Sequence, residues 1–349
     1  MTEKSISFRA HLQSNTTDLL TNAGIECTHT VRLVTGLVSM LAAYTEEGTP
    51  LSPSVFICNS ISDLLKMSGV GEHVPLSAAV DTGGAASRIL KFAAPLCGGG
   101  WSIYVEREGD GRRCKFGVFC GSNDPSSLTV DEVVLGEPIK DFPVVRVAQN
   151  VVNKVEVRTS NGSAVEFRFN DDADIEMLNN RSQVANLASA ASRDLETPDA
   201  SFTGFMDRIL SSSIRDSHGT LIAVVPRDLA EIPEALSDSV KLDEPINLYE
   251  RYKLHMEENR TAVSVSRLQV ASKLLSGFIN SDGITILDSG GQVLGYRAFI
   301  KSADADTPAT GGARTRAYAA LSALVGNGLS GAFFRSQDGR MDSNFIPGT

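Results

Sequence analysis

Residues 263–300 read VSVSRLQVASKLLSGFINSDGITILDSGGQVLGYRAFI, and this stretch decides the fold class. Apolar residues recur at helical spacing over 263–280 and predict an amphipathic helix. Beyond Asp282-Gly283, apolar runs flank Gly290-Gly291 and predict two strands, over 283–288 and 293–300, joined by a tight turn. A helix that leads directly into a β-hairpin indicates a mixed α and β fold.

The rest of the C-terminal part continues this alternation of helices and strands. The same reasoning predicts helices over 202–212, 248–256 and 314–324, and strands over 219–225 and 329–334. We therefore expect an α/β (α+β) fold, with a C-terminal mixed β-sheet flanked by helices.

The N-terminal part also mixes the two kinds of element. Capping residues from Asn15 and an apolar helical pattern predict a helix over 15–45, and an apolar run over 54–58 predicts a buried strand. Two β-hairpins are expected, each around a Gly-containing turn. Their strands are 101–106 with 113–120, and 151–159 with 164–169.

The length of 349 residues suggests two domains. A helix predicted from Asn170 to Leu195 precedes the break at Pro198, so the boundary is expected in or near it. We expect an N-terminal α/β domain of unknown role over 1–175, a helical linker over 176–201 and a second domain over 202–349.

Composition limits the classes of function. The net charge is −10, and an acidic surface repels phosphate backbones, so bulk nucleic-acid binding is not expected. The most apolar stretch, 33–44, is too short to span a bilayer, and residues 1–13 lack the pattern of a signal peptide. Because no stretch is long enough to span a bilayer, no membrane partner is expected. Five cysteines form no CxxC pair, which favours reduced thiols and a cytoplasmic location.

Three segments carry residues suited to binding chemistry, and each also has an ordinary structural explanation. Residues 311–316 (GGARTR) open a predicted helix, where glycines, free N–H groups and arginines suit phosphate; they could equally be a loop end and a solvated face. Residues 281–284 (SDGI) place an acid before a strand, but Asp-Gly is a common turn pair. Residues 335–339 (RSQDG) follow a strand and could bind a ligand or form a plain turn.

The order of these segments resembles the diadenylate cyclase domain. In that family a helix passes through Asp-Gly-Ala into a hairpin, a later helix begins with Gly-Thr-Arg-His-Arg, and a strand ends in Ser-Glu-Glu-x-Gly. Here Asp282-Gly283-Ile284, residues 312–317 (GARTRA) and residues 336–339 (SQDG) are similar in the same order. An upstream helix and strand, 205–210 and 218–222, resemble the first part of the domain. The resemblance covers about residues 202–345.

The resemblance implies roles for individual residues. Asp282 would be the catalytic aspartate of an active enzyme, on the metal or hydroxyl side, and a ligand for Mg or Mn. The metal is expected only with catalysis or a bound nucleoside triphosphate. The remaining positions would bind the nucleotide or its phosphates. They are Gly283, Gly312, Arg314, Thr315, Arg316, Ser336, Gln337 and Asp338.

The chain departs from the family pattern at the reaction centre. Ile284 replaces an alanine and would narrow the pocket, Thr315 replaces a histidine, and Gln337 replaces a glutamate. Binding tolerates such changes more easily than in-line phosphoryl transfer does, because transfer depends on positioning and electrostatics.

Three functions remain open on this basis. The first is a nucleotide or cyclic-dinucleotide sensor, resembling the DACNV-type probable sensors of bacterial nucleotide signalling and anti-phage defence, with a possible effector protein as partner. The second is an active nucleotidyl cyclase that makes a linear or cyclic dinucleotide and works as a homo-oligomer, because two sites must face each other. The third is a non-catalytic interaction module with a vestigial site.

Overall fold

The structure is a computed structural model that describes residues 8–67, 71–98, 100–136, 142–151, 153–169, 176–227, 229, 231–300, 312–337 and 339–347. The chain divides into two compact units. The N-terminal unit is Met1–Asn123 with Leu128–Asp172, and the C-terminal unit is Asp124–Ser127 with Ala173–Thr349. Both units contain helices and strands, so the expectation of a mixed α/β fold is confirmed.

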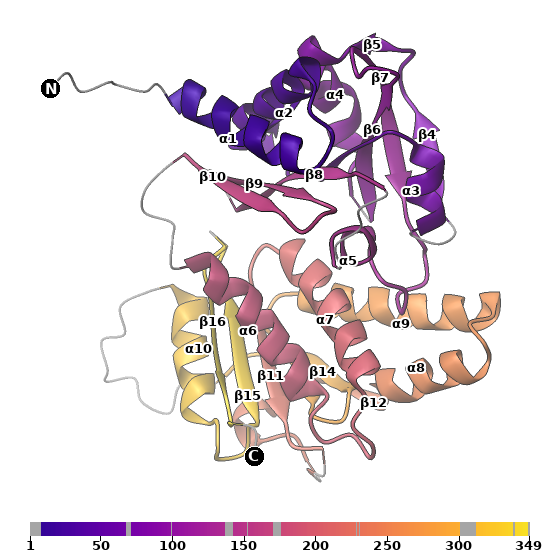
Figure 1. Cartoon of the computed structure of the whole chain (residues 1–349). Coiled ribbons are helices and arrows are strands. Elements are labelled where there is room, and N and C mark those ends of the chain that lie inside the picture. The colour runs from indigo at the N-terminus through magenta and orange to yellow at the C-terminus, as the bar shows by residue number, and fades with distance from the viewer. Residues whose placement is uncertain are drawn as a thin grey trace, which may run out of the picture. The chain divides into compact units, whose positions relative to one another are not determined.

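The N-terminal unit is built around an eight-stranded sheet in the order β10-β9-β8-β3-β6-β7-β4, with β5 paired to β7 (Figure 1). Its strands are β3 (Val55–Cys58), β4 (Glu72–Pro75), β5 (Val80–Asp81), β6 (Trp101–Glu108), β7 (Arg113–Cys120), β8 (Val145–Val151), β9 (Lys154–Thr159) and β10 (Ala164–Arg168). A separate ribbon pairs β1 (Thr45–Glu46) with β2 (Thr49–Pro50). The α-helices are α1 (Phe8–Asn22), α2 (Thr28–Leu41), α3 (Ile61–Met67), α4 (Ala86–Ala93) and α5 (Val130–Leu135).

Both faces of this sheet are covered. Buried residues of α1, α2 and α4 form one core with the sheet, and Val55 and Ile57 of β3 point into it. Phe56 and Cys58 point the other way, into a smaller core with α3 and α5. Because successive side chains of a strand face opposite sides, β3 can be buried along its whole length, as its continuous apolar sequence predicts.

The single helix predicted over 15–45 is wrong, because two helices occupy this region. α1 ends at Asn22, and Gly24 follows with a φ of 70°, in the left-handed region. The N–H of Ile25 then donates to the carbonyl of Leu20 at 3.0 Å, a bond that closes the end of a helix. α2 begins only at Thr28.

Gly24→Ala is expected to destabilise the N-terminal unit by about 1 kcal/mol, because a side chain is unfavourable at positive φ. A Cβ at this position would meet nothing within 4 Å, so the cost comes from the backbone alone. Urea unfolding followed by the fluorescence of Trp101, the single tryptophan, measures it. Gly98→Ala, at a glycine with open space and no positive φ, should leave the midpoint unchanged.

The hairpin of β6 and β7 is confirmed, and so is the second hairpin, although its first strand begins three residues later than predicted. The chain reverses at Asn153, whose φ is 67°, so β8 ends at Val151 and β9 begins at Lys154. β9 then pairs with β10 as expected, and also with β8, a pairing that was not predicted. Asparagine tolerates the left-handed conformation better than most residues do, which explains the reversal.

The C-terminal unit contains a six-stranded sheet in the order β12-β14-β13-β11-β15-β16. The strands are β11 (Thr220–Val225), β12 (Val240–Asn247), β13 (Ile284–Asp288), β14 (Gln292–Ala298), β15 (Gly331–Arg335) and β16 (Met341–Phe345). Its α-helices are α6 (Glu176–Ala191), α7 (Ala200–Arg215), α8 (Leu248–Glu257), α9 (Ala262–Ile279) and α10 (Ala313–Ala323).

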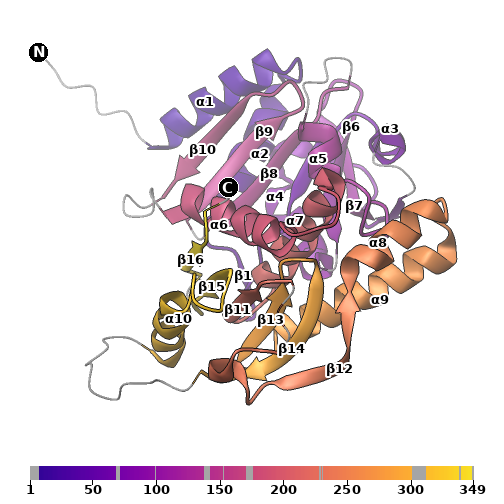
Figure 2. The ribbon, with the colours of Figure 1, turned by 90° about the horizontal axis from the view of Figure 1, so that it is seen from below.

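Helices cover this sheet unequally. α6, α7, α8 and α9 contribute to one core with Ile222 and Val224 of β11, whereas α10 packs with Leu221 and Ala223 on the other face. Figure 2 shows α10 separated from α6 and α7 by β15 and β16. Only β11 and β13 are parallel; every other described pair in the sheet is antiparallel.

The residues expected to form a linker belong in part to this core. Leu187, Ala188 and Ala191 of α6 are buried with residues of α7 and the sheet. α6 therefore packs as a structural helix of the C-terminal unit. The start of the predicted helix, 170–175, lies outside the described residues.

The two edge strands β12 and β16 were not predicted from the sequence. Their sequences, VKLDEPIN and MDSNF, contain acids, asparagine and a proline, which are uncommon in strands. At a sheet edge, backbone pairing with one neighbour is enough, and a proline is tolerated there. The Gly-Gly hairpin of β13 and β14 and the helices α7 to α10 follow the prediction closely.

Candidate functional site

The three predicted binding segments meet at one end of the central strands of the C-terminal sheet. Gly219 and Gly283 immediately precede the parallel strands β11 and β13, which start level with each other, Leu221 opposite Ile284. β15 runs antiparallel to β11 and ends at Arg335, opposite Thr220. We call the strand ends at this side, with the start of α10, the motif edge. Segments up to about 120 residues apart in the chain thus lie close together.

Gly219 is the point of closest approach. Its φ is 101°, and a Cβ built there would lie 3.0 Å from the carbonyl oxygen of Arg335. The same Cβ would lie 3.2 Å from both the Nη1 atom of Arg314 and the backbone nitrogen of Gln337. Arg314 also donates from Nη1 to the carbonyl of His218 at 3.3 Å. Residues of two distant segments, the start of α10 and the end of β15, therefore lie against one glycine.

The start of α10 supplies positive charge at this edge. Gly312 is the N-cap residue and provides no side-chain cap, so the first backbone N–H groups retain their capacity to bind an anion. Arg314 and Arg316 are two positions apart and therefore leave the helix in different directions. Arg314 reaches Gly219, whereas Arg316 is exposed and Thr315 is half-buried.

The Asp282-Gly283 turn lies at the start of β13, the strand that pairs with β11. Gly283 has a φ of 96°, and a Cβ there would come within 2.8 Å of the Cα of Arg297, so glycine is required. Asp282 is exposed and reaches solvent at the motif edge. Ile284, expected to narrow a pocket, is instead 1% exposed in the core under α10.

The turn after β15 has a structural role of its own. Both the backbone N–H and the hydroxyl of Ser336 donate to the carbonyl of Arg340, at 2.8 and 3.1 Å. Gly339 donates back to the carbonyl of Ser336 at 3.2 Å, which closes the turn. The Ser336 hydroxyl is therefore engaged locally, whereas the Gln337 side chain is exposed. Asp338 lies outside the described residues, as do 301–311.

Two arginines at the motif edge were not predicted as site residues. Arg297 lies beside Gly283 and is exposed, with a φ of 56°, which is unusual for a non-glycine residue and recurs at functional sites. Arg335 is half-buried and donates to the carbonyl of Ser217, and burial lowers the pKa of its guanidinium while Asp216 opposes that effect. The sequence gives no signal for the backbone conformation of Arg297.

Cations outnumber acids around this edge. Among the described residues, no carboxylate lies within the 4.0 Å ion-pair distance of Arg297 or Arg314. The described part of the chain contains no group of three His, Cys, Asp or Glu side chains that could hold a metal ion. The motif edge can therefore bind an anion through guanidinium and backbone N–H donors.

A Ser-His-Asp arrangement also occurs in this unit, but it is buried. Nδ1 of His255 lies 2.9 Å from Oγ of Ser264, and Nε2 lies 3.0 Å from a carboxylate oxygen of Asp124. His255 and Ser264 are 0% and 2% exposed, and the Ser264 hydroxyl donates to the carbonyl of Thr261. A nucleophile must reach its substrate, so this cluster is structural.

Comparison with known proteins gives no relative. No family model, no curated protein and no solved structure matches the chain. The resemblance to the diadenylate cyclase domain therefore stays a prediction. No helix among the described residues is long and apolar enough to cross a membrane.

Proposed function

We propose that the C-terminal unit binds a nucleotide or cyclic dinucleotide at the motif edge and acts as a sensor. The observation that supports this best is the meeting of Arg314, Gly219 and the Gln337 backbone at the uncapped start of α10. A helix start with a guanidinium beside it offers both N–H donors and fixed charge to a phosphate. On the resemblance, the protein would act in cytoplasmic bacterial signalling or anti-phage defence, and the N-terminal unit would pass the bound state to an effector.

Arg314→Ala is expected to weaken nucleotide binding by at least tenfold, because a charge-assisted hydrogen bond contributes about 1.5–3 kcal/mol. Calorimetric titration of the full chain with ATP, GTP and cyclic di-AMP measures the effect. Lys273→Ala removes an exposed cation from α9 and is the matched control. If no nucleotide bound the wild-type chain, or if Arg314→Ala bound as well as wild type, the proposal would be wrong.

A catalytic version of this proposal rests on Asp282, which is exposed at the same edge as Arg314. It requires Mg or Mn, and a homo-oligomer in which two sites face each other. Incubation with each of the four NTPs and either metal, followed by mass detection, would reveal a dinucleotide product. Asp282→Asn should abolish that product while leaving nucleotide binding in place, which separates catalysis from sensing.

A further inference from the structure

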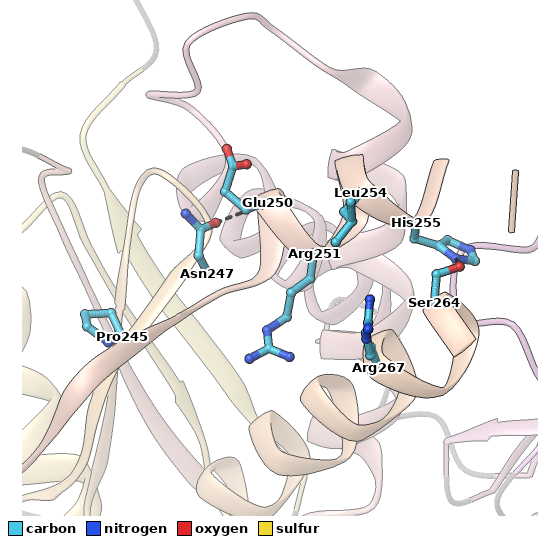
Figure 3. A pocket seen from close by; sticks show the side chains of 8 residues that line it. All are labelled: Pro245, Asn247, Glu250, Arg251, Leu254, His255, Ser264 and Arg267. Atoms are coloured by element: carbon cyan, nitrogen blue, oxygen red, sulfur yellow. Dashed lines mark hydrogen bonds between the residues drawn. The ribbon is translucent and has the colours of Figure 1, made fainter. Parts of the chain in front are cut away.

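An opening lies between the helices α8 and α9 of the C-terminal unit, and none of its lining residues belongs to the motif edge. It is a cavity of about 400 Å³, a size typical of small-molecule sites. Figure 3 shows Arg251 of α8 and Arg267 of α9 in the same opening between the two helices. The lining residues are Pro245, Asn247, Glu250, Arg251, Leu254, His255, Ser264 and Arg267.

The charges of this cavity are unbalanced in favour of the cations. Glu250, its one acid, is engaged by Lys253 at 2.7 Å. Arg267 has a long contact of 3.5 Å with Glu258, and 57% of its side chain is exposed. For Arg251, the described residues provide no ion-pair partner. Two guanidinium groups therefore converge on one space in a chain whose net charge is −10.

The walls of the cavity are held in place before any ligand binds. Asn247 caps α8 by accepting from the N–H of Glu250 at 2.9 Å. Ser264, near the start of α9, is joined to His255 of α8 at 2.9 Å, and both side chains are buried. The two arginines thus project from helices whose spacing is fixed, which lowers the entropy lost when a ligand is bound.

We propose that this cavity binds a small organic phosphate, independently of the motif edge. A tetrahedral phosphate can accept hydrogen bonds from the two guanidinium forks at once. The cavity is larger than a phosphate group, and Pro245 with the 43%-exposed Leu254 offers apolar surface to an organic part. Arg251 contributes more to the affinity for the phosphate than Arg267 does, because no described carboxylate competes for it.

The test uses ribose 5-phosphate and citrate as probes in calorimetric titrations of the full chain. Ribose 5-phosphate should bind, and Arg251→Ala combined with Arg267→Ala should weaken it by at least tenfold. Arg251→Lys keeps the charge but loses the planar fork, so its affinity for ribose 5-phosphate should lie between those of wild type and the double variant. Lys273→Ala should bind as wild type does.

The motif-edge variant Arg314→Ala separates the two sites. Ribose 5-phosphate should bind this variant with wild-type affinity, whatever the result for nucleotides. Loss of binding in Arg314→Ala would assign the phosphate to the motif edge and overturn the second site. Absence of ribose 5-phosphate binding, unchanged binding in the double variant, or tighter binding of citrate than of the phosphate would overturn the proposal as well.

Discussion

Phe202→Ala is expected to destabilise the C-terminal unit by about 3–5 kcal/mol, the usual cost of removing a buried aromatic ring. Phe202 is 0% exposed on α7. Its ring centroid lies 5.0 Å from that of Tyr249, 5.5 Å from that of Tyr252 and 5.8 Å from that of Phe205. The ring also fills the space over Gly291, where a Cβ would come within 2.8 Å of it. Three neighbouring aromatic rings would lose packing at once.

Hydrogen exchange of the β11 and β13 amides measures this effect within the C-terminal unit, because these central strands report its global opening. Phe299→Ala is the matched control in the same unit, since Phe299 is 47% exposed and should change stability little. Equal protection in Phe202→Ala and wild type would show that α7 is not a core helix.

The packing of α7 was largely predictable from the sequence. Phe205, Ile209 and Leu210 fall on one face at helical spacing, and all are buried. Asp199, directly after the predicted break at Pro198, accepts from the N–H groups of Ser201 and Phe202 and caps the helix. The break and the helix start are one feature, so the helix begins earlier than predicted.

The candidate site could be predicted only in part. Local patterns identified Asp282-Gly283 and the start of α10, because glycine turns and helix starts are encoded by neighbouring residues. That these segments share an edge depends on strand order, with β11 between β13 and β15, which local patterns do not encode. Arg297 was missed because its left-handed backbone lies where the register between β13 and β14 shifts, which local patterns do not encode.

The buried cluster around His255 was also beyond sequence reasoning. Asp124 and Ser126 lie 131 and 129 positions from His255 in the chain, inside a stretch with turn-like composition. Nothing local distinguishes this stretch from an exposed loop. The four residues Asp124–Ser127 nevertheless belong to the C-terminal unit, and Arg208 of α7 donates to the carbonyl of Ser126 at 3.1 Å.

His255→Ala is expected to destabilise the C-terminal unit by about 3–5 kcal/mol, because it leaves a cavity and removes the imidazole hydrogen bond to the buried carboxylate of Asp124. The Asp124 side chain is 9% exposed, so its carboxylate cannot regain full hydration when the imidazole is lost. Urea unfolding at pH 7 measures the loss. His11→Ala, at an exposed histidine of α1, is the control and should have little effect.

The pH dependence of this effect has a definite sign. Burial alone would raise the pKa of Asp124, but hydrogen bonds from Ser126 and His255 outweigh it and lower that pKa below its ordinary 3.8. A carboxyl whose folded-state pKa is depressed contributes stability that is present at neutral pH and is lost as the pH falls through the folded pKa. In His255→Ala one of these hydrogen bonds is lost, so the folded-state pKa of Asp124 should rise and the variant should lose less stability on acidification than wild type does.

A double-mutant cycle with Asp124→Asn separates this pair from simple loss of packing. The neutral amide keeps the shape of the carboxylate but removes its charge. If the pair is the cause, His255→Ala should cost clearly less in the Asp124→Asn background, with a coupling energy of about 1–3 kcal/mol. Additive effects would instead assign the whole loss of stability to the cavity left by the imidazole. The urea midpoint would then fall by the same amount on acidification with and without His255.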